Sequence, residues 1–127
     1  MNEVVRVAIL GAESSGKSTL AAALAARYGT IWVPEYLREF VETERRVPYE
    51  TDQAGIARTQ LERENDAAAL ASRFLFCDTT PFMTALYSRV YWQRVDSQLA
   101  ALEAAHDYAY TLVAAPDGPW VLIRPTG

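Results

Sequence analysis

The sequence predicts an α/β domain in which a parallel sheet is covered by helices on both faces. Short apolar runs alternate with helical segments along the chain, and this order implies parallel strands joined by right-handed crossovers. The first and last apolar runs show no alternation of polar and apolar residues, which is typical of strands buried on both faces. A glycine-rich loop stands between the first run and the first helical segment, where a phosphate-binding loop lies in such a fold.

Four strands and five helices are expected. The apolar runs that predict strands lie at 4–10, 30–33, 74–77 and 110–115. The helical segments lie at 17–28, 34–45, from about 52 to 72, from 80–81 onward, and at 96–105. Gly29 ends the first helix because it tolerates positive φ, Pro34 opens the second, and Thr51 or Asp52 can cap the third.

The fourth helix combines a start signal with an apolar stripe. Thr80 and Pro81 form a pair of N-cap and first helical residue. Phe82, Leu86 and Val90 then recur at i, i+4 and i+8, the spacing of one helix face. The last helix places the leucines at 99 and 102 on one face.

Length, composition and charge exclude several classes of protein. The 127 residues read as one domain, 1–127, and half of them are hydrophobic, which is an ordinary globular composition. The net charge of -4 argues against a general nucleic-acid binder, since no basic stripe neutralises phosphates. The single cysteine excludes an internal disulfide, and the first apolar segment is too short to span a membrane. The sequence predicts a soluble, cytoplasmic protein without membrane association.

Residues 11–18, GAESSGKS, match the spacing G-x-x-x-x-G-K-[ST] of a phosphate-binding loop. Gly11 and Gly16 permit backbone angles that turn successive N–H groups inward around an anion, and the following helix adds its positive N-terminus. Lys17 can then reach the β- and γ-phosphates of ATP, and the Ser18 hydroxyl can bind Mg²⁺. A turn that merely joins strand to helix is the alternative, and the position of the loop between strand and helix disfavours it.

Two acids follow predicted strands, at the edge of a parallel sheet where ligands gather. Asp78 directly follows the run FLFC, where a carboxylate could hold Mg²⁺ directly or through water; a helix-capping or loop role is the alternative. Glu35 follows the second strand and could orient or deprotonate an acceptor hydroxyl; a solvated acid favoured by the helix dipole is the alternative. Arg38, one turn further on, could contact substrate or pair with a carboxylate.

The remaining candidates are weaker. His106 has no cysteine or histidine partners and suits a surface or capping role, and Cys77 lies inside an apolar run and suits the core. The charges of QLEREND, residues 60–66, are most simply a solvated helix face, although Gln60 could face the cleft. Three aromatic residues at helical spacing favour packing over a base-stacking platform, and these are Tyr87, Tyr91 and Trp92.

The chain resembles the ribosylnicotinamide kinase domain of the NadR-like P-loop kinases. The matching pieces run in family order over residues 5–121, and they are GAESSGKSTL, WVPEYLREF, IARTQ, FCDTTPFMTALYS and YTLVAAPDGPWV. The resemblance implies a P-loop kinase-like sheet of order 2-3-1-4-5. It also implies transfer of phosphate from ATP to the 5′-hydroxyl of a nucleoside-like substrate, for example nicotinamide riboside, in NAD biosynthesis or salvage.

The resemblance also implies roles for individual residues, which add to those read from the loop and the strand ends. Lys17, Glu35 and Asp78 are expected to be catalytic, and Ser18 and Asp78 to hold the metal. The expected ATP-binding residues are Gly11, Ser14, Ser15, Gly16, Lys17, Ser18 and Thr19. The expected substrate-binding residues are Glu35, Arg38 and Gln60, the last near the substrate base.

The resemblance stops near residue 121. Family members continue with a segment like VADGLR, an arginine-bearing lid, a fifth strand and a terminal helix, whereas this chain reads VLIRPTG. We therefore expect an incomplete domain, with 122–127 as an aberrant tail and the fourth strand as an exposed apolar edge. Codons for the last four residues can encode the family's continuation in another reading frame, so we hypothesise that the tail is a frameshift product.

Three functions are compatible with these residues. The leading hypothesis is an ATP-dependent kinase of a small nucleoside. A nucleotide-binding module or truncated remnant without transferase activity would share Lys17 and Ser18 but lack the lid. A P-loop ATPase acting on a macromolecule is disfavoured by the chain length and by the lack of an identifiable arginine finger.

Overall fold

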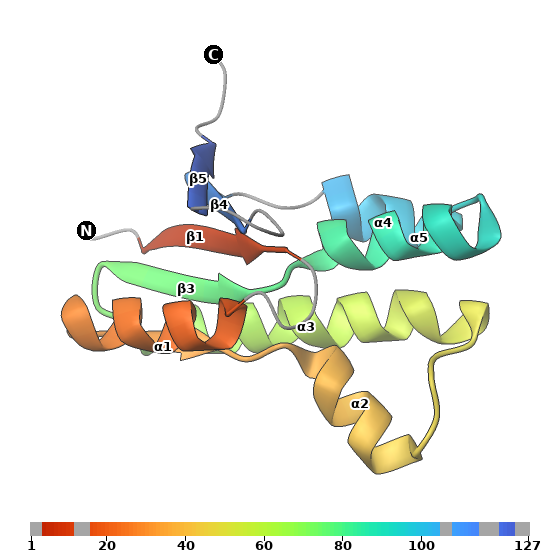
Figure 1. The fold of residues 1–127 in the computed structure, drawn as a ribbon, viewed down its shortest axis with the longest axis horizontal. Helices are drawn as coiled ribbons and strands as arrows, with labels where there is room; N and C mark the ends of the chain where they lie inside the picture. Colours follow the sequence, from red (N-terminus) through yellow and green to blue (C-terminus); the bar gives the residue numbers. More distant parts are fainter. Residues whose placement is uncertain (1–3, 12–15, 105–107, 115–119, 124–127) are drawn as a thin grey trace.

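The described part of the chain forms a five-stranded sheet with helices on both faces (Figure 1). The structure is a computed structural model that describes residues 4–11, 16–104, 108–114 and 120–123. The strands are β1 Val5–Leu10, β2 Ile31–Val33, β3 Phe74–Asp78, β4 Tyr110–Ala114 and β5 Trp120–Ile123. The helices are α1 Lys17–Arg27, α2 Tyr36–Glu44, the 3-10 turn η1 Glu50–Asp52, α3 Gln53–Ala68, α4 Pro81–Trp92 and α5 Ser97–Ala104. Within these ranges no helix is both long enough and apolar enough to cross a membrane.

The strand order is β2-β3-β1-β4-β5. Strands β2, β3, β1 and β4 pair parallel with one another, while β5 pairs antiparallel with β4. The expected α/β fold class is therefore confirmed. The expectation that β4 is an exposed edge is wrong, because residues 120–123 pair antiparallel with β4 and cover that edge. Consecutive strands can pair antiparallel through a short connection, whereas another parallel strand would need a long crossover.

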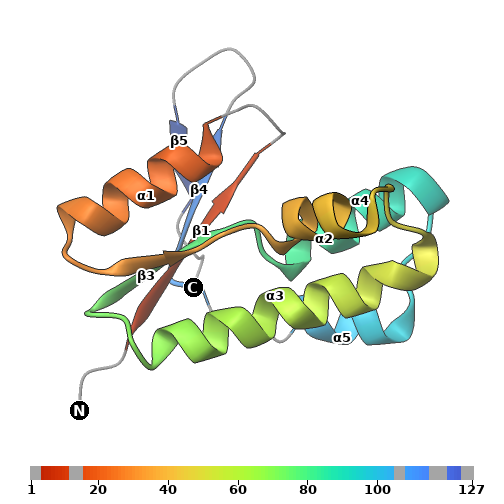
Figure 2. The ribbon, with the colours of Figure 1, turned by 90° about the horizontal axis from the view of Figure 1, so that it is seen from below.

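Helices α1 and α3 lie on opposite sides of the strands (Figure 2). On one face Ile9 packs with Ala21 and Ala25 of α1. On the other face Leu75 and Cys77 pack beneath the last turn of α3. Cys77 is fully buried, which confirms its expected place in the core. The two helices thus keep water from the central strands, and the ends of those strands remain available for a site.

Helix α4 packs through small side chains rather than through its apolar stripe. Phe82, Leu86 and Val90 are 39%, 38% and 65% exposed, so this stripe does not face the core. The buried face of α4 contributes Ala85, which lies in one cluster with alanines of α3 and with Leu99 of α5. Small side chains let helices approach closely, and this contact decides which face of α4 is covered. Leu99 is buried as expected.

The buried face of α3 carries a fully buried carboxylate. Glu64 is 0% exposed, although the sequence placed the run 60–66 on a solvated helix face. Tyr108 donates a hydrogen bond to Glu64 Oε1 at 2.6 Å, and Arg6 Nη1 lies 3.5 Å from the same oxygen. No described residue makes a hydrogen bond to Glu64 Oε2. Burial therefore raises the pKa of Glu64 to about 7, against the opposing effects of Tyr108 and Arg6.

This raised pKa predicts a stability that falls as the pH rises. The pKa of this carboxyl is about 7 in the folded protein and 4.5, the ordinary value, in the unfolded chain. The difference stabilises the folded state fully at pH values below the unfolded pKa. That contribution is lost as the pH rises through the folded pKa, and amounts to about 3 kcal/mol. Replacing Glu64 with glutamine should remove most of this pH dependence. Urea unfolding of both proteins at about pH 5 and about pH 8 measures it, and equal pH dependence would contradict the assignment.

Candidate active site

The carboxyl ends of three neighbouring strands bring the predicted site residues together. Strand β1 leads through Gly11 to the phosphate-binding loop, β2 is followed by Glu35, and β3 ends at Asp78. Ile9 of β1 is the direct neighbour of Asp78 in the sheet. Helices α2 and α4 lie beyond these strand ends (Figure 2). The topology therefore places the loop and both acids at one edge of the sheet, as parallel strands require.

Helix α1 begins directly after Gly16, at this edge of the sheet. Gly16 precedes the helix with φ 85°, a left-handed conformation in which any other residue would be strained. Gly11, directly after β1, also has a positive φ, of 148°. Thr19 is exposed in the first turn of the helix, whose first N–H groups have no partners within the helix. Of the other predicted loop ligands, Ser14 and Ser15 lie outside the described residues, as does His106.

Lys17 is the only lysine among the 127 residues, and it is 7% exposed. Its Nζ donates a hydrogen bond to the Gly11 carbonyl at 2.8 Å. The same Nζ lies 3.8 Å from Glu35 Oε2, whose side chain is also almost buried. The ammonium therefore stands between the phosphate-binding loop and the acid predicted to act on the acceptor.

Ser18 and Asp78 form a second polar pair. The Ser18 hydroxyl donates to Asp78 Oδ2 at 2.7 Å, and Asp78 is 1% exposed. Burial raises the pKa of Asp78 above its ordinary value, and the nearby charge of Glu35 raises it further. The hydrogen bond from Ser18 and the charges of Lys17 and Arg38 act in the opposite direction.

The donor chemistry of this pair fits Mg²⁺. A hydroxyl and a carboxylate supply the hard oxygen ligands that Mg²⁺ prefers, and this ion commonly takes only one or two protein ligands beside phosphate and water. The described ranges contain no group of three or more His, Cys, Asp and Glu side chains that could hold a metal by themselves. Ser18 and Asp78 are thus suited to a metal that a nucleotide helps to bind.

Glu35 is held by a residue that the sequence analysis missed. The Thr79 hydroxyl donates to Glu35 Oε2 at 2.7 Å, although the two residues come from different strand ends. The signal available in the sequence was the position of Thr79 directly after Asp78. Arg38 is exposed, and no ion pair of Arg38 occurs within the described ranges, although its charge lowers the pKa of Asp78.

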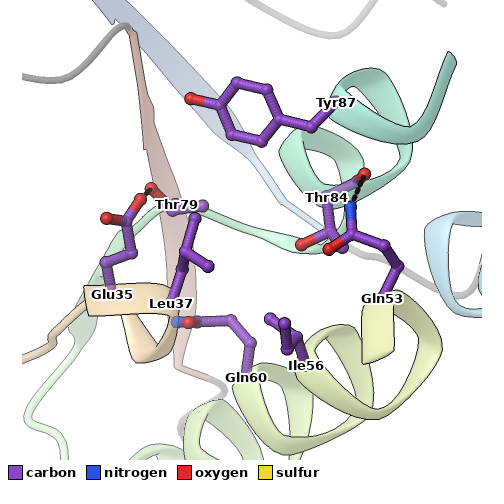
Figure 3. A pocket seen from close by; sticks show the side chains of 8 residues that line it. All are labelled: Glu35, Leu37, Gln53, Ile56, Gln60, Thr79, Thr84 and Tyr87. Carbon is purple, nitrogen blue, oxygen red and sulfur yellow. Dashed lines mark hydrogen bonds between the residues drawn. The ribbon is translucent and has the colours of Figure 1, made fainter. Parts of the chain in front are cut away.

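A small pocket opens beside Glu35 and Thr79 (Figure 3). Eight residues line it, and they are Glu35, Leu37, Gln53, Ile56, Gln60, Thr79, Thr84 and Tyr87. Gln60 is 2% exposed and uses both ends of its amide on the backbone around Glu35. Tyr36 N donates to Gln60 Oε1 at 2.8 Å, and Gln60 Nε2 donates to the Pro34 carbonyl at 3.3 Å. Gln60 thus lines the pocket as the sequence suggested, and it also supports the turn that carries Glu35.

A wider groove of about 700 Å³ continues from this pocket, which is within the range of small-molecule sites. The pocket and the groove share Leu37, Gln53 and Tyr87. Tyr91 and Trp92 line the groove further out, and Tyr91 is 71% exposed. Tyr91 and Trp92 therefore border an open cavity, whereas Tyr87 both lines it and packs against a buried core cluster.

Comparisons with known proteins agree with this architecture. The AAA domain family matches residues 6–126 of the chain. The structure of the NadR protein in complex with NR has a TM-score of 0.75 and 23% sequence identity, over 87% of this chain and 33% of that one. The structure of NadR in complex with NAD and AMP-PNP has a TM-score of 0.73 and 22% sequence identity, over 87% of this chain and 34% of that one. Thymidylate kinase from Candida albicans has a TM-score of 0.59 and 14% sequence identity, over 89% of this chain and 63% of that one. No curated protein matches the sequence.

These likenesses establish the fold. The expected resemblance to NadR-like P-loop kinases is confirmed at the level of the backbone, as is the order β2-β3-β1-β4 of the four parallel strands. The chain spans about a third of the length of the NadR structures.

Proposed function

We propose that this chain, which belongs to the AAA domain family, is an ATP-dependent kinase domain that phosphorylates the 5′-hydroxyl of a nucleoside-like acceptor, nicotinamide riboside. The proposal is carried by one observation, the meeting of Lys17, Glu35 and Asp78 at one sheet edge beside a pocket. Lys17 and Asp78 suit the phosphates of ATP and its metal, whereas Glu35 suits the acceptor. A transferase needs both sets of groups side by side, and a module that only binds nucleotide needs the first set alone.

Each group has a distinct role in the proposed reaction. The Lys17 ammonium neutralises charge on the phosphates. Ser18 and Asp78 would hold Mg²⁺, which supplies further neutralisation of the phosphate oxygens when it is bound. Glu35 accepts the proton of the acceptor hydroxyl. At the same time the acceptor oxygen forms a bond to the γ-phosphorus, and the bond between that phosphorus and ADP breaks.

The groove next to the pocket supports an acceptor with an aromatic, cationic base. Tyr87, Tyr91 and Trp92 border the groove, and aromatic faces attract cations. A pyridinium ring such as that of nicotinamide riboside carries a positive charge, whereas the base of thymidine is neutral. Gln60, which lines the pocket, and Arg38, an exposed residue of α2 whose charge reaches Asp78, are the further substrate contacts that we propose.

Acceptor-dependent release of ADP tests the proposal. With ATP and Mg²⁺, we expect nicotinamide riboside to raise ADP release at least about tenfold over the rate without acceptor, since positioning of the acceptor contributes much of the acceleration. Thymidine should give a smaller increase. ATP binding without turnover would instead indicate a nucleotide-binding module, and hydrolysis that ignores the acceptor would indicate an ATPase.

A further inference from the structure

Thr79 lies between the two acids of the candidate site. It follows Asp78 directly and is 5% exposed. Its Oγ1 lies 2.7 Å from Glu35 Oε2 and 3.5 Å from Asp78 Oδ1, and Figure 3 shows the hydroxyl directed at the Glu35 carboxylate. A hydroxyl carries one proton, and the shorter contact shows that this proton is donated to Glu35.

The backbone of Thr79 adopts a conformation that threonine rarely takes. Its φ is 72°, in the left-handed region, where a β-branched residue is a true outlier. The Thr79 N–H donates to the Ile9 carbonyl of β1 at 2.9 Å, so the neighbouring strand holds this turn in place. Strain of this kind persists where the surrounding structure over-determines it, and such residues cluster at functional sites. The strained turn delivers the hydroxyl to Glu35.

The rest of Glu35 is held from the opposite side. Gln60 binds the backbone immediately before and after Glu35, at Pro34 and at Tyr36. Within the described ranges, the hydrogen bond and the ion pair that reach the carboxylate both end on Oε2, from Thr79 and Lys17. This arrangement fixes the carboxylate through one oxygen and leaves Oε1 to meet an acceptor hydroxyl.

We propose that Thr79 is a positioning residue for Glu35. Its hydroxyl holds Oε2 so that Oε1 accepts the proton of the acceptor, and Thr79 itself transfers no proton. This inference rests on the proposed kinase function. It assigns the hydroxyl a role in turnover that is separate from binding of ATP.

Replacing Thr79 with valine tests this role, because valine keeps the shape and branching of threonine but lacks the hydroxyl. We expect T79V to lower kcat about 10- to 100-fold, the cost of a misplaced catalytic group, with the KM for ATP changed less than about twofold. Thr79→Ser keeps the hydroxyl and should retain about half of kcat or more. Thr43→Val, on the exposed face of α2, is the matched control and should leave both constants unchanged.

A second measurement separates positioning from a merely structural role. In the Glu35→Gln background, T79V should cost less than about twofold in single-turnover rate, because both changes remove the same function. Independent, multiplicative losses would overturn the inference, as would full kcat in T79V or equal losses in the valine and serine variants. If one of these results is found and the unchanged protein still shows acceptor-dependent turnover, only the role of Thr79 is overturned and the kinase function is retained. Absence of that turnover in the unchanged protein would overturn both.

Discussion

Replacement of Lys17 with alanine is expected to lower the affinity for ATP about 10- to 100-fold, which is the value of a hydrogen bond to a charged group. Turnover should fall further, about 100- to 1,000-fold, because the ammonium acts on charge that develops during transfer. The side chain is almost buried and Nζ lies between Gly11 and Glu35, so no other described cation can take its place there. Calorimetry with ATP and Mg²⁺ measures the first effect, and ADP release measures the second.

The control for this variant comes from the same helix. Arg27 is exposed in the last turn of α1, where it stacks on Tyr28, and Arg27→Ala should leave ATP binding unchanged. Loss of the Lys17 ammonium also leaves Glu35 without its ion-pair partner, so the thermal midpoint of each variant should accompany the binding data. Unchanged ATP affinity in a folded Lys17→Ala protein would contradict the phosphate-binding role of this loop.

Replacement of Glu35 with glutamine is expected to separate binding from chemistry. Glutamine has the size of glutamate but cannot accept the proton of the acceptor, and loss of a general base costs about 100- to 10,000-fold in rate. ATP affinity should change little, because Glu35 faces the acceptor pocket and meets the loop only through Lys17. Acceptor-dependent ADP release and calorimetry with ATP, run on the same preparation, measure both quantities.

Glu42 provides the comparison for Glu35. It is an exposed acid of α2 and lies outside the pocket lining, so Glu42→Gln should match the unchanged protein in both assays. If Glu35→Gln retained full acceptor-dependent turnover, the proton would have to go elsewhere, and the assignment of Glu35 as base would be wrong.

Local signals in the sequence were sufficient for much of the fold and of the site. The glycines of the loop, the buried strands and the caps all act over a few residues, and they predicted the order of strands and helices. The meeting of Lys17, Glu35 and Asp78 also followed from the sequence, because parallel strands bring their carboxyl ends to one edge. The individual chemical roles of these residues stay predictions until the variants are measured.

The features that the sequence did not reveal depend on distant partners. Glu64 is buried because Tyr108, 44 residues away, meets it, and nothing near Glu64 in the sequence indicates this. The apolar stripe of α4 stays exposed because alanines of another helix set the contact. The contact between Thr79 and Glu35 likewise joins two strand ends that only the folded sheet brings together.

The ion pair between Lys17 and Glu35 makes the two substrates of the proposed reaction cooperative. In the proposed reaction, a phosphate group that attracts the ammonium weakens its hold on Glu35 Oε2, and an acceptor hydroxyl that donates to Oε1 reduces the negative charge that attracts the ammonium. Each ligand therefore prepares the subsite of the other. By thermodynamic reciprocity, the factor by which ATP tightens acceptor binding equals the factor by which the acceptor tightens ATP binding.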